Sequence, residues 1–314
     1  MPSLNGDHAH GLIAQHCRQL VELQGPVLDN RDREPLRQMD RSVRALHNGL
    51  MQFEPALELP QSLNLKRLAK TRRRLALVRD LDRLHERLEA SFLPQAPERE
   101  VRRLKPVLRQ LKRERQLAHD HLAVALRSSA HLEQLAHLQG WLRDPRYTRL
   151  GEEPLAGWQR EWAQEPPALM LHRGWWVAER GEESASLRDL SERIEALSAR
   201  LGNLPQPATG GSRSWLRQLR RGCDLLSELN DLTLLHKAID DQLRDGSERT
   251  VPQLDWLLEQ HHLQCWRQWR ELAAGLMAAQ QRRRRPLQQL ATWQGMSAAG
   301  RIRAGLISLA GRLS

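Results

Sequence analysis

The chain has 314 residues, and its Lys and Arg exceed Asp and Glu by a net charge of +11. It is long enough for one large domain or for two halves that share a core. With one Tyr and two Phe, and with Leu, Arg, Gln, Ala and Glu abundant, the composition excludes a β-rich protein and predicts an all-α fold. The excess of positive charge favours a polyanionic partner over a neutral small molecule.

The composition and the N-terminal residues also bear on location. Three scattered cysteines without a CxxC spacing predict no disulfide framework and fit a reducing compartment. The first residues lack the pattern of a secretory signal, and no stretch has the length of a membrane span. We therefore expect a cytoplasmic protein without membrane contact.

Apolar residues spaced by three and four positions predict a first helical half at 10–143, within one domain that covers 1–314. Ser128 and Ser129 offer N-terminal caps for the last helix of this half, which ends near Trp141. The helices are expected at about 10–24, 33–57, 62–91, 98–128 and from about 129 to 141.

Residues 144–183 differ from the rest because Pro, Gly and Trp are interspersed there, and they are interpreted as a connector. Its tryptophans, Trp158, Trp162, Trp175 and Trp176, are expected to pack on the bundle rather than to stack on bases. The second half, 184–314, is expected to hold helices at about 184–202, 212–244, 252–281 and 285–312. Four arginines, Arg282 to Arg285, precede Pro286 at the last helix junction and are interpreted as a general anion contact.

Two separate segments of the first half recur at an offset of 151 positions. Leu36 to Leu50 match Leu187 to Leu201, and Leu65 to Leu88 match Leu216 to Ile239. Leucine matches are common in helical sequences, so the weight rests on four polar matches, Arg37/Arg188, Lys66/Arg217, Asp80/Asp231 and His85/His236. The pattern predicts an internal duplication that folds into two pseudo-symmetric half-bundles around a shared groove.

The sequence contains no arrangement typical of an active site. It has no HExxH motif, zinc-finger spacing, GxSxG, Walker or GxGxxG loop, so no enzyme activity, metal site or cofactor is expected. Asp80 and Asp82 point about 200° apart on a helix and cannot flank one reacting atom. Asp80 is expected instead to orient Arg79 or another nearby base, or to cap a bend.

Positive charge is concentrated between Gln61 and Arg115, with 17 Lys and Arg against 7 Asp and Glu. Many of these side chains are three or four residues apart, which aligns them along one helix side, where they repel one another unless anions lie beside them. Phosphates of a polymer recur at a comparable spacing. The alternative interpretation is a solvated helix face in a basic protein.

Short motifs in both halves resemble the CHAD family, the conserved-histidine α-helical domains. The segment Val78 to Leu84, VRDLDRL, resembles the family's RDLD segment, and Leu226 to Leu235, LSELNDLTLL, resembles its second-half signature. Leu36 to His47 and Leu187 to Leu197 are similar to the two copies of its first-helix motif. The resemblance spans about residues 10–245 and implies two mostly four-helix halves around a basic cavity that binds inorganic polyphosphate.

The chain is a divergent member by this comparison. Arg37 and Arg188 stand where the family has its histidines, and Asp40 and Ser191 stand where its next arginine is expected. An arginine keeps a phosphate donor because the guanidinium is always charged and can bind in a bidentate manner. Asp40 and Glu195 carry negative charge and therefore oppose phosphate binding.

The leading interpretation is a non-enzymatic protein that binds inorganic polyphosphate or a similar polyanion in a basic groove between the halves. One alternative is RNA binding through the same helices, and another is a degenerate helical scaffold for a protein partner. RNA ranks lower because few aromatic side chains accompany the charges. An association with polyphosphate granules and the oligomeric state stay open. The candidate phosphate-binding residues are Arg37, Arg44, Lys66, Lys70, Arg73, Arg79, Arg109, Lys112, Arg113, Arg188, Arg217 and Arg220.

Overall fold

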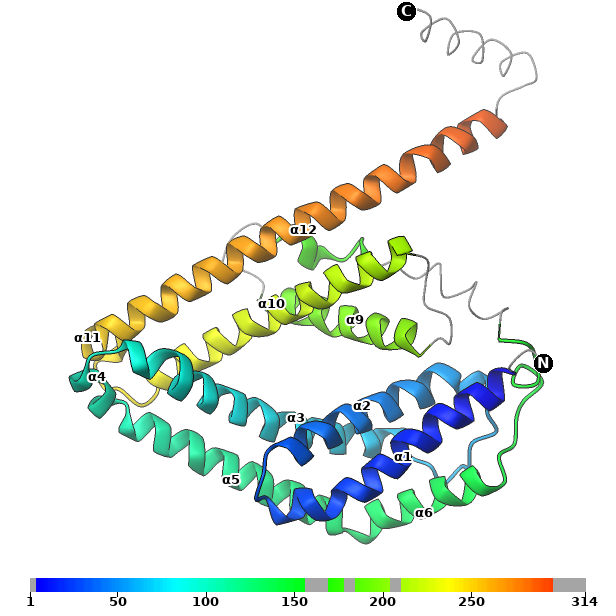
Figure 1. Ribbon diagram of the computed structural model, residues 1–314, viewed down its shortest axis with the longest axis horizontal. Helices are drawn as coiled ribbons and strands as arrows, with labels where there is room; N and C mark the ends of the chain where they lie inside the picture. Colours follow the sequence, from blue (N-terminus) through cyan, green and yellow to red (C-terminus); the bar gives the residue numbers. More distant parts are fainter. Residues whose placement is uncertain (1–3, 156–168, 178–183, 204–209, 296–314) are drawn as a thin grey trace, which may run out of the picture.

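The computed structural model describes residues 4–155, 169–177, 184–203 and 210–295, and within these ranges the chain is almost entirely helical (Figure 1). The first half is a bundle whose helix α2 packs against both α1 and α3, while α5 packs on α3. Its helices are α1 (Asn5–Asp29), α2 (Glu34–Phe53), α3 (Leu65–Arg87), α4 (Glu98–Arg103), α5 (Lys105–Arg127) and α6 (Ser129–Arg143).

The second half lies above the first in Figure 1 and is built around α10, which packs against α9 and α12. Helix α9 also contacts α2, so the two halves meet along these helices. The bounds are α9 (Ser184–Gly202), α10 (Gly210–Asp240), α11 (Gly246–Thr250) and α12 (Pro252–Gly295).

The local signals in the sequence explain where several helices begin. The Asn64 side chain accepts a hydrogen bond from the backbone N–H of Arg67 at the start of α3, and Ser128 does the same for His131 at the start of α6. Both bonds satisfy backbone donors that a helix end leaves without partners. The expected all-α fold and the cap at Ser128 are confirmed.

Both copies of the 151-residue offset fall on helices. The segments Leu36 to Leu50 and Leu187 to Leu201 lie on α2 and α9, and most of the second pair lies on α3 and α10. Their apolar positions form one buried core, in which Leu46 and Leu197 are 0% and 3% exposed. The agreement concerns secondary structure, and the duplication itself stays a prediction.

The connector packs through one of its tryptophans. Trp175 is 3% exposed, and its ring is stacked on that of Trp269 of α12 with 5.3 Å between centroids. Trp176 is exposed, while Trp158 and Trp162 lie outside the described residues. Packing on the bundle is therefore seen for Trp175.

The C-terminal helix differs from the sequence expectation. The sequence predicts that the four arginines and Pro286 separate two helices, whereas α12 runs from Pro252 to Gly295 as one element. The expected break is therefore wrong: a proline removes one backbone hydrogen bond and can kink a helix without ending it. The remainder of the expected last helix, 296–312, lies outside the described residues. Among the described helices, none combines the length and the apolar character needed to cross a membrane.

Candidate functional site

A pocket of about 510 Å³ opens beside the contact between α2 and α9. Its charges come from α2 and α3, and α9 contributes Ala199. The volume falls within the range that proteins use for small ligands. The lining residues are Arg37, Asp40, Arg41, Arg44, Ala45, Asn48, Arg79, Arg83, Glu86 and Ala199.

Helical spacing brings the five arginines together. Arg37, Arg41 and Arg44 follow one another at intervals of four and three residues on α2, and Arg79 and Arg83 are four apart on α3. Residues at these intervals share one helix face. The apolar positions of both helices, such as Leu46 and Leu75, are fully buried, so the arginines emerge at the edge of the core.

Asp40 lies between two of these arginines. Its carboxylate is almost fully buried and accepts hydrogen bonds from Arg44 Nη2, at 2.8 Å, and from Arg79 Nη1. Burial lowers the pKa of Arg44, and the nearby charge of Arg79 lowers it further, although the carboxylate of Asp40 raises it. Burial also disfavours the charged form of Arg79, but Asp40 and Asp80 outweigh it and raise the pKa of that guanidinium.

The outer arginines pair with other carboxylates. Arg37 Nη2 donates to both oxygens of Glu86, at 2.7 and 2.6 Å. Arg83 Nη2 donates to Asp231 of α10 at 2.7 Å, and Arg44 also pairs with Glu195 of α9. Arg41 pairs with Glu34 at 2.9 Å. All five arginines therefore have a carboxylate partner, and that partner fixes the position of each guanidinium.

The five arginines of the lining are partly exposed, from 22% of the side chain for Arg44 to 65% for Arg41. Each guanidinium has five N–H donors, and Arg44, Arg79 and Arg83 each divide theirs between two carboxylates. Within the lining, the five arginines lie beside Asp40 and Glu86. Their further partners, Glu34, Asp80, Glu195 and Asp231, add negative charge around the pocket.

The structure brings three of the predicted phosphate-binding residues to this pocket, namely Arg37, Arg44 and Arg79. The others do not line it. Lys66, Lys70 and Arg73 are exposed on the first part of α3; Arg109, Lys112 and Arg113 are exposed on α5; Arg188, Arg217 and Arg220 are exposed on α9 and α10. Lys112 lines a smaller depression of about 270 Å³ that also includes Arg33 and Arg115.

Arg41 and Arg83 are pocket residues that the sequence interpretation missed. Arg41 lies four residues after Arg37, and Arg83 lies four residues after Arg79. This interval places each pair on one helix face and could have identified both residues from the sequence. The prediction for the two aspartates agrees with the structure. Asp80 binds Arg79 and Arg83, whereas Asp82 is buried and pairs with Arg115 and Arg33.

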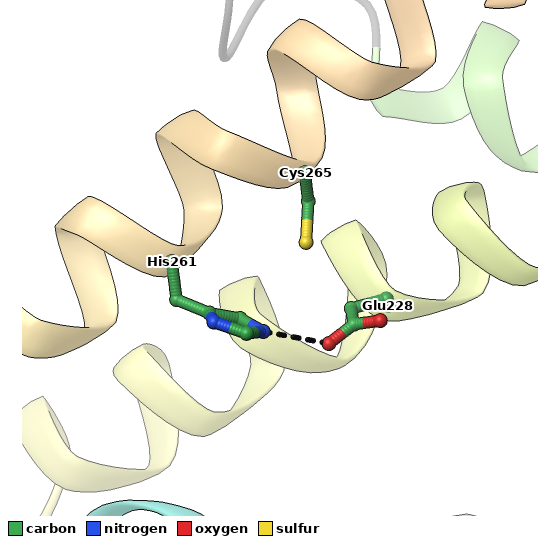
Figure 2. Close-up of side chains that lie close together, drawn as sticks. All are labelled: Glu228, His261 and Cys265. Carbon is green, nitrogen blue, oxygen red and sulfur yellow. Dashed lines mark hydrogen bonds and ion pairs between the residues drawn. The ribbon is translucent and has the colours of Figure 1, made fainter.

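A second cluster joins α10 to α12 (Figure 2). His261 and Cys265 extend from α12 toward Glu228 of α10, and possible ligand atoms of the three residues all lie within 4.8 Å of one another. His261 Nε2 lies 2.7 Å from Glu228 Oε1, which also accepts a hydrogen bond from Arg87 at 3.0 Å. Burial, followed by the charge of Glu228, raises the pKa of Cys265 to about 11. The sequence pattern gave no signal for this cluster, because its members lie on two helices.

Comparison with known proteins gives a family match and two similar structures. Residues 11–170 match the CHAD domain family. A structure described as "Crystal structure of the CHAD domain from the plant Ricinus communis" is 18% identical, with a TM-score of 0.63, and the alignment covers 88% of this chain and 93% of that one.

A second structure, "PptA from Streptomyces chartreusis", is 17% identical with a TM-score of 0.60. That alignment covers 89% of this chain and 99% of the other. At these identities the likeness concerns the fold. No curated protein sequence matches the chain significantly.

Proposed function

The chain belongs to the CHAD family, and we propose that it binds inorganic polyphosphate, or a chemically similar polyanion, in the pocket formed by α2, α3 and α9. The observation that carries the proposal is the convergence of five arginines on one pocket. The ligand class is the one that the family resemblance implies. No catalytic step is proposed.

The ion pairs in the pocket shape the way in which a polyanion would bind. Asp40 and Glu86 hold Arg44, Arg79 and Arg37 in place, so little side-chain entropy is lost when a phosphate approaches. Phosphate oxygens take the guanidinium donors that face solvent, in charge-assisted hydrogen bonds. The carboxylates also repel the ligand, but an anion with several closely spaced charges can contact several of the five arginines at once, which favours it over a single phosphate.

Binding of this kind releases counterions. The affinity for a polyanion therefore falls as salt rises, with a slope that reports how many phosphates are neutralised. The pocket volume of about 510 Å³ suits a short oligophosphate.

The experiment compares two double variants that remove the same charge. Arg37→Gln with Arg41→Gln changes the pocket, and Arg109→Gln with Arg113→Gln changes the exposed face of α5. Isothermal titration with tripolyphosphate is expected to show a loss of about tenfold per pocket arginine. The α5 variant should lose less than about threefold. Equal losses in both variants, or no binding by the wild type, would refute the pocket as the site.

RNA binding is the second candidate, and one observation favours it. Arg102, Lys105 and Arg109 are exposed along α4 and α5 together with Lys112 and Arg113, and such a face fits an extended backbone. Competition between polyphosphate and RNA of equal charge separates the two functions. RNA binding that depends on the α5 pair and not on the pocket pair would favour this candidate.

A further inference from the structure

Glu228, His261 and Cys265 offer the three ligand types that a borderline-soft metal prefers: a carboxylate, an imidazole and a thiolate (Figure 2). From this juxtaposition we propose that the chain binds one zinc ion between α10 and α12. The inference is independent of the proposed polyanion pocket, which lies between α2, α3 and α9.

The positions of the three residues suit a shared ion. His261 and Cys265 are four residues apart and therefore lie on the same face of α12. Glu228 faces them from α10, which packs along α12. The imidazole of His261 also contacts Phe92 edge to face, with 5.8 Å between ring centroids, and this contact restricts the ring.

The donor set selects the class of metal. Zinc takes Cys, His and carboxylate ligands at about 2.0–2.3 Å, usually four in a tetrahedron. Magnesium and calcium prefer oxygen ligands alone, so a buried thiol argues against them. Three protein ligands leave the fourth position to water or to an external anion.

The two anionic ligands balance the charge of the zinc ion. In the bound form Zn²⁺ carries +2, while Glu228 and the Cys265 thiolate carry −1 each. Arg87 touches Glu228 and Asp231, and Arg83 pairs with Asp231, so these three groups add two positive charges and one negative. Binding breaks the S–H bond of Cys265 and releases that proton to solvent, while His261 binds as the neutral imidazole. Arg83 also pairs with Asp80, so the two arginines and two aspartates balance one another and the bound site is close to neutral.

Cobalt(II) is the probe for the test, because a cysteine thiolate bound to Co²⁺ gives a near-ultraviolet charge-transfer band that carboxylates and imidazoles do not give. The chain has 13 histidines, which can bind metal weakly elsewhere, so a thiolate signal is needed. We expect one equivalent of Co²⁺ to produce the band and Zn²⁺ to displace it. The absence of this band in the full-length wild-type protein would overturn the proposal.

Variants locate the site. Cys265→Ser should abolish the band, and the matched control Cys223→Ser, on α10 and bonded to Ser191, should retain it. Because Cys265 is buried, His261→Gln at the half-exposed position provides a second variant, expected to weaken Zn²⁺ binding at least about tenfold. Zn²⁺ should also raise the Tm of the wild type and not that of His261→Gln. A band that survives in Cys265→Ser, or an equal rise in Tm for both proteins, would contradict the site.

Discussion

Arg83 of α3 reaches across to Asp231 of α10, with its Nε 2.6 Å from Oδ2 and its Nη2 2.7 Å from Oδ1. The two residues come from different halves of the chain, and Asp231 is almost fully buried. Asp80 and Asp231 are equivalent under the 151-residue offset, and Arg83 pairs with both. Arg83, which lines the pocket of α2, α3 and α9, thus also links the two halves of the chain.

The carboxylate of Asp40 is expected to oppose polyanion binding and to support the fold. Asp40→Asn removes one negative charge from the pocket, so the affinity for tripolyphosphate should rise about tenfold. The same change weakens the contacts to Arg44 and Arg79 and should lower the free energy of unfolding by about 1–2 kcal/mol. Titration and urea unfolding of one preparation measure both effects. Unchanged or weaker binding would argue against a ligand near Asp40.

The stacking of Trp175 on Trp269 predicts that two substitutions on α12 differ strongly in their effect on the free energy of unfolding. Trp269 is fully buried against Trp175, whereas Trp256 is 54% exposed. Trp269→Ala should lower the free energy of unfolding by about 3–5 kcal/mol, because it leaves a cavity and removes a ring contact. Trp256→Ala is the control and should cost less than about 1 kcal/mol. Similar losses at both positions in chemical unfolding would contradict this packing.

Replacing either of two glycines by alanine is expected to change the stability of the protein, in opposite directions at the two positions. A Cβ at Gly151 would lie 2.2 Å from the carbonyl oxygen of Ala56, so Gly151→Ala must displace backbone and should destabilise the protein. Gly140 lies within α6 with nothing close to the position of a Cβ. Gly140→Ala should therefore stabilise the protein by about 0.5–1 kcal/mol. Thermal unfolding of the two variants and the wild type measures these changes. A shift of Tm in the same direction for both variants would be inconsistent with the structure.

A buried histidine predicts a loss of stability in mild acid. Burial lowers the pKa of His131, because the charged form is poorly solvated. A group whose pKa falls on folding stabilises the protein above its unfolded pKa, near 6.5, and this contribution is lost as the pH falls through the folded pKa. The wild type should therefore lose free energy of unfolding between about pH 7.5 and about pH 5.

The variant His131→Gln should show a smaller loss over that interval in urea unfolding. His137→Gln is the matched control, since His137 is exposed on the same helix, α6, and it should follow the wild type. If His131→Gln and the wild type lose stability equally, the buried imidazole is not responsible.

Much of the fold could be predicted because apolar spacing records which side of a helix is buried. The helices that this spacing predicts at about 33–57 and 62–91 contain Leu46 and Leu75, which are fully buried. The break expected at Pro286 was wrong, since local signals cannot tell a kink from a helix end. Tertiary packing decides such cases.

The site was harder to predict because a basic stripe does not reveal what it faces. Val107, Leu111 and Leu122 form the buried side of α5, so Arg109 and Arg113 necessarily point toward solvent. Arg37 and Arg79 reach the pocket because α2 and α3 lie beside each other. The partners Glu86 and Asp231 are distant in sequence, and only the folded chain brings them to these arginines.

A crystal structure of the chain with tripolyphosphate would show where the ligand binds. We predict phosphates in the pocket of α2, α3 and α9, with oxygens within hydrogen-bond distance of Arg37, Arg41 and Arg83. Phosphates found along the outer face of α5, with the pocket arginines still bound only to their carboxylates, would contradict it.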